Sequence, residues 1–127
     1  PVHTFEEISN LQQKFPNNIR HFNLYNNDKI IAGTTVFVTD TVAHPQYISG
    51  NEQKNELGSI DFLYNHLIFD VFKDINFFDF GISHEQNGKK INQGLLFWKE
   101  TFGAKTTIQN FYEVQTSDYH LLENVML

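Results

Sequence analysis

The sequence predicts an α/β fold of the α+β kind, a mixed sheet with helices on both faces. An amphipathic helical pattern precedes three β-rich segments joined by tight turns, which indicates an antiparallel meander. After residue 50, helical and strand-like patterns alternate, which indicates βαβ-type connections added to that meander. The chain has 127 residues, enough for one domain with its own core, so we treat 1-127 as a single domain.

The first half of the chain supplies the predicted meander. Residues 5–15 carry apolar side chains at helical spacing, with Thr4 as N-cap and Glu7 three residues later. Strands are predicted at 19–25, 29–39 and 42–49, separated by turns at 26–28 and 40–41. Gly33 marks a possible bulge in the second strand, and Pro45 suggests an irregular or edge position in the third.

The second half supplies the predicted βαβ-type units. Its apolar spacing favours long helices, and Gly103 ends the second of them. An apolar run ending in a glycine favours a strand covered on both faces. The predicted elements are a loop at 50–57, a helix at 57–73, a strand at 77–82, a helix at 91–102, a strand at 106–114 and a helical turn or packing segment at 117–127.

Composition excludes several classes of function. The formal net charge is -6 and the longest basic run is Lys89-Lys90, so extensive nucleic-acid binding is not expected. No stretch approaches the ~20 apolar residues of a membrane helix. There is no cysteine, and the six histidines are scattered without a metal-ligand spacing, so no metal is expected. A cytoplasmic location is compatible with the absence of cysteine and of a secretory signal pattern.

Three stretches carry a resemblance to a known family. They are "VAHPQYISGNEQKNELGSIDFLYNHLI" (42–68), "FFDFGIS" (77–83) and "NQGLLFWKETFGA" (92–104). With the order of elements, they resemble the GNAT superfamily of acyltransferases, and more closely the GNAT-like domain of Fem-type peptidyltransferases and of acyltransferases from bacterial polysaccharide gene clusters. Fem-like proteins carry two such halves. The resemblance therefore implies that this chain, which begins with Pro1, is most of the C-terminal half of a longer one.

The resemblance implies acetyl-CoA or another acyl-CoA as co-substrate. In the family, the strand before the long helix pairs with the pantetheine arm, and the next loop and helix N-terminus bind the pyrophosphate. The positions that match are Tyr47, Ile48, Ser49, Asn51, Gln53, Leu57, Gly58 and Ser59. The loop "NEQKNELGS" departs from the basic, glycine-rich family pattern, since it holds two glutamates, one lysine and one glycine. The alternative is a solvated loop that only caps the helix.

Three residues are candidates for catalysis. Asp79 stands alone among phenylalanines near a strand end, where sites gather in open α/β sheets; otherwise it orders the following loop. His44 is a candidate base for an acceptor amine, since imidazole does this near neutral pH without tuning; otherwise it is a structural histidine. Glu85 lies in a loop rich in polar side chains and is a catalytic or acceptor-contacting candidate.

Substrate contacts are predicted at Gln46, Ser83 and Asn92, although Asn92 also fits a plain helix N-cap. Lys99 is expected at the helix surface or in an ion pair, and the alternative is an anion-binding role.

The preferred hypothesis is an N-acyltransferase that acts on an amine, for example of an amino sugar or cell-envelope precursor. The alternatives are a Fem-like aminoacyl transfer domain and a non-catalytic GNAT-like scaffold. The expected partners are a small-molecule acceptor and either a missing N-terminal GNAT-like half or a second copy of the chain.

Overall fold

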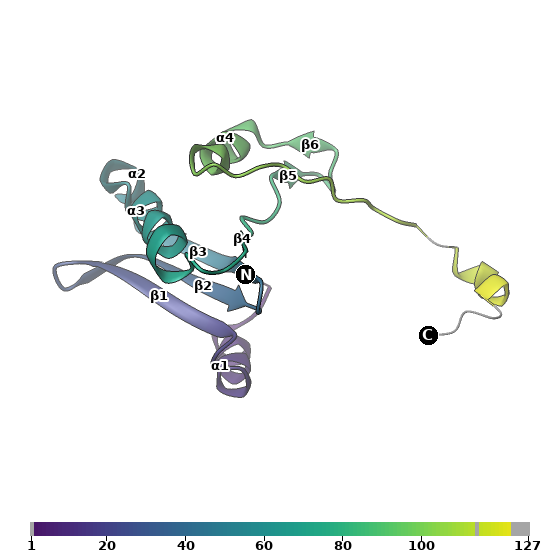
Figure 1. Ribbon diagram of the computed structural model, residues 1–127, viewed down its shortest axis with the longest axis horizontal. Coiled ribbons are helices and arrows are strands. Elements are labelled where there is room, and N and C mark those ends of the chain that lie inside the picture. The colour runs from purple at the N-terminus through teal and green to yellow at the C-terminus, as the bar shows by residue number, and fades with distance from the viewer. Residues whose placement is uncertain (1, 114, 123–127) are drawn as a thin grey trace.

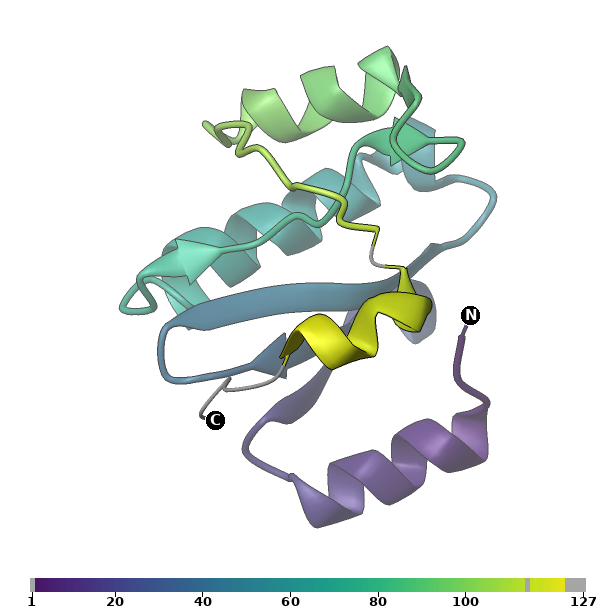
Figure 2. The ribbon, with the colours of Figure 1, turned by 90° about the vertical axis from the view of Figure 1, so that its right-hand side faces the viewer.

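A computed structural model describes residues 2–113 and 115–122 (Figure 1). The elements are α1 (Phe5–Lys14), β1 (Ile19–Asn26), β2 (Lys29–Val38), β3 (Val42–Gly50), α2 (Lys54–Leu57), α3 (Ser59–His66), the π-helical turn η1 (Leu67–Val71), β4 (Phe77–Phe78), β5 (His84–Glu85), β6 (Lys90–Ile91), α4 (Gln93–Thr101) and the 3-10 segment η2 (Thr116–Leu122). A four-stranded sheet in the order β1-β2-β3-β4 lies between α3 on one face and α1 on the other (Figure 2). The predicted mixed sheet with helices on both faces is confirmed.

The first helix forms as its capping signals predict. The Glu7 N–H donates to Thr4 Oγ1 at 3.3 Å, and the Thr4 N–H donates to Glu7 Oε2 at 2.7 Å, which completes a capping box. These hydrogen bonds hold the pKa of Glu7 below its usual value. The helix ends at Phe15, directly before Pro16. It buries no side chain, so local capping rather than a packed core stabilises α1.

The meander β1–β2–β3 is antiparallel, as predicted, but its bulges differ from the expectation. Ile31 has no partner on β1, because the pairing jumps from Leu24↔Ala32 to Tyr25↔Ile30. The bulge predicted at Gly33 is therefore wrong by two residues. On β3, Gln46 has no partner on β2, because the pairing jumps from Thr35↔Tyr47 to Val36↔Pro45. The irregularity predicted at Pro45 is confirmed.

One βαβ unit follows the meander. Helix α3 and the π-helical turn η1 carry the chain across the sheet to β4, which pairs with β3 in parallel. The helix predicted at 57–73 is thus present as 59–71. The predicted loop at 50–57 is partly wrong, because its last four residues form α2.

The core lies between this connection and the sheet. Buried apolar side chains of the helical segment pack on small and branched side chains of β2 and β3. The opposite face of the sheet therefore does not contact α3. The core residues are Ala32, Val36, Ala43, Leu63, Leu67 and Phe72.

Two predicted strands are shorter or absent. Only Phe77–Phe78 of the strand predicted at 77–82 is extended and paired, because the chain turns at Gly81, whose φ is +69°. Residues 106–113 form no strand, so that prediction is wrong, and residue 114 lies outside the described residues. Segment η2 agrees with the predicted helical turn, and 123–127 lie outside the described residues.

A small hairpin was missed in the predicted polar loop. Strands β5 and β6 are joined by residues 86–89, in which the Lys89 N–H donates to the Gln86 carbonyl oxygen at 3.3 Å. The two central positions, Asn87 and Gly88, have φ values of +54° and +85°, and positive φ at both is the geometry of a tight hairpin turn. The Asn-Gly pair was the available signal.

Helix α4 packs on α3 through aromatic rings. The buried Tyr64 ring lies 5.1 Å from the Trp98 ring and 5.7 Å from the Phe80 ring, measured between centroids. Trp98 Nε1–H also donates to Asp61 Oδ1 at 2.5 Å. Burial in this cluster raises the pKa of Tyr64. The contacts fix α4 and the segment after β4 relative to the sheet.

Candidate active site

Strands β3 and β4 form a fork. They pair only at Val42↔Phe77 and Ala43↔Phe78, and the last link is the Asp79 N–H donating to Ala43 O at 2.9 Å. Beyond that point β4 ends, while β3 runs on to Gly50. The edge of β3 from His44 to Gly50 therefore has no strand partner within the described residues. Unpaired N–H and C=O groups on such an edge accept an extended ligand as readily as another strand.

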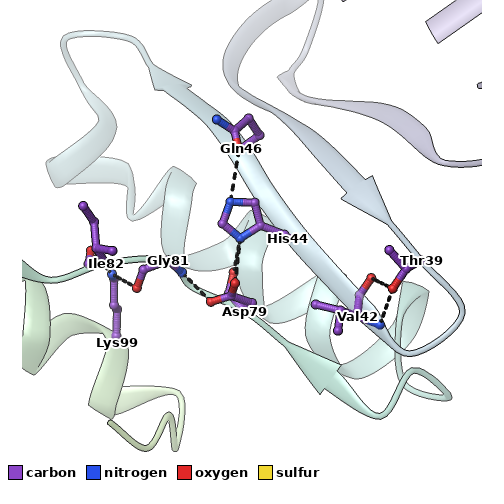
Figure 3. Close-up of polar contacts among 8 residues, drawn as sticks. All are labelled: Thr39, Val42, His44, Gln46, Asp79, Gly81, Ile82 and Lys99. Atoms are coloured by element: carbon purple, nitrogen blue, oxygen red, sulfur yellow. Dashed lines mark hydrogen bonds and ion pairs between the residues drawn. The ribbon is translucent and has the colours of Figure 1, made fainter. Parts of the chain in front are cut away.

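His44 and Asp79 meet where the two strands separate (Figure 3). Nδ1 of His44 lies 3.0 Å from Asp79 Oδ2 and 3.1 Å from the Asp79 carbonyl oxygen. Both of those atoms only accept hydrogen bonds from the ring, since a carboxylate and a carbonyl carry no proton. Nδ1 therefore bears the proton, and Nε2 is the nitrogen left to exchange one. The structure brings together two of the three residues predicted for catalysis.

Gln46 lies beside the second nitrogen of His44. Its Oε1 is 3.1 Å from His44 Nε2, and Gln46 is the bulged residue of β3 (Figure 3). The contact joins a residue predicted to bind substrate to the predicted base. When the side-chain amide turns so that its NH₂ faces the ring, it donates to an unprotonated Nε2.

The other oxygen of Asp79 orders the next turn. Asp79 Oδ1 accepts the Gly81 N–H at 2.8 Å (Figure 3). Gly81 has a left-handed φ, and a Cβ placed on it would lie 3.3 Å from His44 Cε1. The loop-ordering alternative for Asp79 is therefore correct as a description of its contacts, and it coexists with the His44 contact.

The prediction that Lys99 lies at the helix surface or in an ion pair is wrong. It is 5% exposed, and its Nζ donates to the carbonyl oxygens of Gly81 at 2.9 Å and Ile82 at 2.6 Å (Figure 3). Burial lowers the pKa of Lys99, and the nearby Asp79 charge opposes that shift. Lys99 stands three residues after Leu96 and three before Phe102, on the inward stripe of α4, and this spacing was the available signal. It anchors the loop that carries Asp79.

The residues predicted for cofactor binding lie along the free edge of β3 and around the start of α3. Asn51 Oδ1 accepts the Gln53 N–H at 3.1 Å, which shapes the loop. Gly58 is the N-cap of α3, with φ +56° and no capping side chain. Ser59 is 1% exposed, and its Oγ has no hydrogen-bond partner. No side chain therefore caps the N-terminus of α3, and anion sites use such uncapped N–H groups.

The remaining members of that set differ in exposure. Ile48, Ser49 and Leu57 are exposed, and Tyr47 is half-buried. Both glutamates of the loop, Glu52 and Glu56, are also exposed.

Glu85, Ser83 and Asn92 form a separate hydrogen-bonded group on the hairpin. Asn92 caps α4 by accepting the Leu95 N–H at 2.9 Å, as its plain interpretation predicts. Its Nδ2 donates to Glu85 Oε1 at 2.9 Å, and its N–H donates to the Ser83 carbonyl at 2.9 Å. Glu85 Oε2 also pairs with Lys90 at 3.4 Å. None of these bonds joins the hairpin group to His44.

Within residues 2–113 and 115–122, no group of three or more His, Asp or Glu side chains is arranged to hold a metal ion. In the same residues, no helix is long and apolar enough to cross a membrane.

Comparison with solved structures identifies the fold. An aminoglycoside acetyltransferase from an uncultured soil metagenomic sample, determined in complex with trehalose, matches with a TM-score of 0.55 and 16% identity. The match covers 91% of this chain and 77% of that protein. No protein-family model and no curated protein sequence matches the chain. The chain has a GNAT-like fold, like that acetyltransferase; its closer resemblance to Fem-type proteins stays a prediction.

Proposed function

We propose that this protein is an N-acyltransferase that moves an acyl group from acyl-CoA to an amine. The observation that carries the proposal is the fork between β3 and β4, with His44 and Asp79 at its base. The fork offers an unpaired strand edge to an extended donor, and it places beside that edge a histidine whose Nδ1 faces the Asp79 carboxylate.

The donor would lie along β3. Its pantetheine arm would pair with the free edge between His44 and Gly50, and its pyrophosphate would approach the uncapped N-terminus of α3 at Gly58 and Ser59. Acetyl-CoA is the simplest such donor, and the acetyltransferase activity named for the structural neighbour supports it.

The reaction would be a direct transfer. The lone pair of the acceptor nitrogen attacks the thioester carbonyl carbon, a C–N bond forms, and the C–S bond breaks. His44 Nε2 takes the proton lost by the amine, and the CoA thiolate leaves and is protonated to the thiol. Asp79 holds Nδ1–H, keeps the ring oriented and stabilises the imidazolium formed at that moment.

The bulge of β3 would bind the developing oxyanion. Pro45 has no N–H, and Gln46 has no partner on β2, so the Gln46 N–H is the candidate donor. An aimed backbone N–H stabilises an oxyanion without further reorganisation.

The acceptor would be a small molecule such as an amino sugar or a cell-envelope precursor. The structural neighbour is named for aminoglycosides and was determined with trehalose, which supports a sugar-like acceptor here. We place the reaction in the cytoplasm, where acyl-CoA is made.

One observation favours a second candidate, a non-catalytic GNAT-like scaffold. The loop that would face the pyrophosphate carries Glu52 and Glu56, and both are exposed. Like charges beside a pyrophosphate weaken its binding. A scaffold needs no donor site. A donor other than CoA, such as an aminoacyl-tRNA, would need a donor site of different chemistry.

Release of the CoA thiol in the presence of amines tests the proposal. The protein is incubated with acetyl-CoA and D-glucosamine, and the products are identified by mass spectrometry. We expect N-acetylated sugar in molar balance with free thiol. Thiol without acetylated product, or no thiol at all, would contradict amine acylation.

A further inference from the structure

A second feature of the fold is a cavity on the sheet face opposite α3. Its volume is about 530 Å³, within the range of small-molecule sites. We call it the sheet pocket. Its polar side chains are His21, Asn23, Thr35, Tyr47, Ser49 and Asn51.

The register places the sheet pocket on the same face as His44. Paired residues of an antiparallel ladder share a face, and alternate residues of one strand share a face. His44 pairs with Phe37 and Tyr47 pairs with Thr35, and Phe37 and Thr35 are two residues apart on β2. The bulge at Gln46 keeps Tyr47 in phase with His44.

The pocket floor is made by Gly33. A Cβ on this residue would lie 2.9 Å from Asn23 Oδ1 and 3.4 Å from the Phe22 carbonyl oxygen. The missing side chain keeps the floor open between β1 and β3. Gly33 also lies between Ile31 and Thr35 on one face of β2, and both of these neighbours line the pocket.

The polar groups of the pocket are ordered by hydrogen bonds, and none of them is a carboxylate, an ammonium or a guanidinium group. His21 bridges Thr35 Oγ1 and Asn23 Oδ1, each at 3.0 Å, through its two ring nitrogens. Tyr47 Oη bonds the His3 ring at 2.5 Å. No Asp, Glu, Lys or Arg lines the cavity, and isoleucines form its apolar walls.

This chemistry selects a ligand class. Hydroxyl, amide and imidazole groups bind sugar hydroxyls, and the isoleucine walls suit the C–H faces of a sugar ring. A polycation would leave its charges without counter-charges here.

We propose that the sheet pocket binds the acceptor, and that the acceptor is a sugar with a single amino group and otherwise uncharged hydroxyls. The part about the amino group rests on the proposed acyl transfer, whereas binding of the sugar ring does not. Side chains of Tyr47 and Ser49 serve the acceptor on this face, while their backbone groups remain on the edge offered to the donor. The amine then approaches the thioester from the side of His44 and Gln46.

Titration of the ¹⁵N-labelled protein with D-glucosamine, without acetyl-CoA, tests the proposal by NMR. We expect shifts of the Gly33 and Ser49 amides with a millimolar Kd, and weaker or no binding of spermine. Asn23→Ala and Ser49→Ala should each weaken binding about tenfold, through loss of hydrogen bonds to the sugar. The matched control, Asn65→Ala, changes an exposed asparagine of α3 on the other face and should leave the Kd unchanged.

Three results would overturn the proposal: amide shifts that map outside the pocket, spermine binding tighter than glucosamine, or equal Kd values for Asn23→Ala and Asn65→Ala. The spectrum of each variant shows whether that variant is folded. The titration contains no acetyl-CoA, so its result is independent of the thiol-release assay. Sugar binding in the titration, together with no thiol release in that assay, would contradict the proposed transfer but not the binding of a sugar in the sheet pocket.

Discussion

At the scale of single residues, the site is a chain of contacts that begins in α4. Lys99 holds the carbonyls of Gly81 and Ile82, Asp79 holds the Gly81 N–H, and the same carboxylate holds His44 Nδ1. Each link fixes one group on the loop after β4. The orientation of the proposed base therefore depends on a buried lysine that does not touch it.

Replacement of His44 should remove the proposed base. His44→Gln is expected to lower kcat for acetyl transfer about 100-fold or more, the usual contribution of a general base. The chain supplies a matched control, because His66 and Asp70 form a second His–Asp pair at 2.8 Å on exposed α3–η1 surface. His66→Gln should leave kcat unchanged, and equal effects of the two changes would contradict the role of His44.

Replacement of Lys99 should destabilise the protein. Lys99→Met leaves the Gly81 and Ile82 carbonyls without their donor, and we expect a loss of about 2 kcal/mol in the free energy of unfolding. Lys73→Met, at an exposed position, should change it by less than about 0.5 kcal/mol. Urea titration measures both, and a neutral Lys99→Met would mean that the loop is held by other contacts.

The same lysine gives a pH dependence of known sign. Because the folded-state pKa of Lys99 lies below the unfolded value, the unfolded chain binds more protons between the two pKa values. The Lys99 contribution to stability therefore rises with pH in that window, up to the unfolded pKa near 10.5. The stability difference between wild type and Lys99→Met should grow as pH rises towards that value. A difference that shrinks would contradict burial as the dominant cause of the shift.

At the scale of elements, the helix from α3 to η1 connects the two strands of the fork. Its inward side chains pack on β2 and β3, and its outward side chains are exposed to solvent. Leu67 is 0% exposed, for example, and Phe69 is 57% exposed. The position of the fork therefore depends on this one packed face.

Alanine substitutions on the buried and the exposed face of η1 should differ in their cost to stability. Leu67→Ala is expected to lower the free energy of unfolding by about 2–5 kcal/mol, through lost burial and the cavity left behind. Phe69→Ala removes a larger side chain and should cost less than about 1 kcal/mol. Thermal unfolding compares the two, and a greater cost at Phe69 would contradict the packing of η1.

The elements also show which parts of the fold are readable from sequence. The capping box of α1 and the turn at Asn27 depend on neighbouring residues, so local signals placed them correctly. The predicted strand at 106–114 had the right composition but finds no partner strand in its described part, because pairing depends on distant residues. The bulge at Gln46 followed from Pro45, whereas Gly33 is explained by close approach to Asn23 rather than by a bulge.

The candidate site, like the fold, contains residues that could be predicted from sequence and residues that could not. Histidine and aspartate were chosen for their chemistry and proved to be partners, although they are 35 residues apart in sequence. Glu85 and Asn92 were chosen for the same reason and proved to bond each other instead. The role of Lys99 was missed because a charged residue on a helix is usually exposed, and the pairing that permits its burial involves backbone carbonyls that no sequence pattern displays.

At the scale of the whole molecule, the sheet presents three separate surfaces. The α3 face holds the core, the free edge of β3 is the site that we propose for the donor, and the opposite face holds the sheet pocket. We propose that the free edge of β3 and the start of α3 together bind an acyl-CoA.

Thermal unfolding with and without acetyl-CoA measures this binding. A ligand that binds only the folded state at about 100 times its Kd adds about 2.7 kcal/mol, which for a domain of this size raises Tm by roughly 10 °C. We predict such a rise with acetyl-CoA, a similar rise with CoA, and a smaller one with adenosine diphosphate, which lacks the pantetheine arm. An unchanged Tm at millimolar acetyl-CoA would contradict a CoA-dependent acyltransferase and favour the scaffold or another donor.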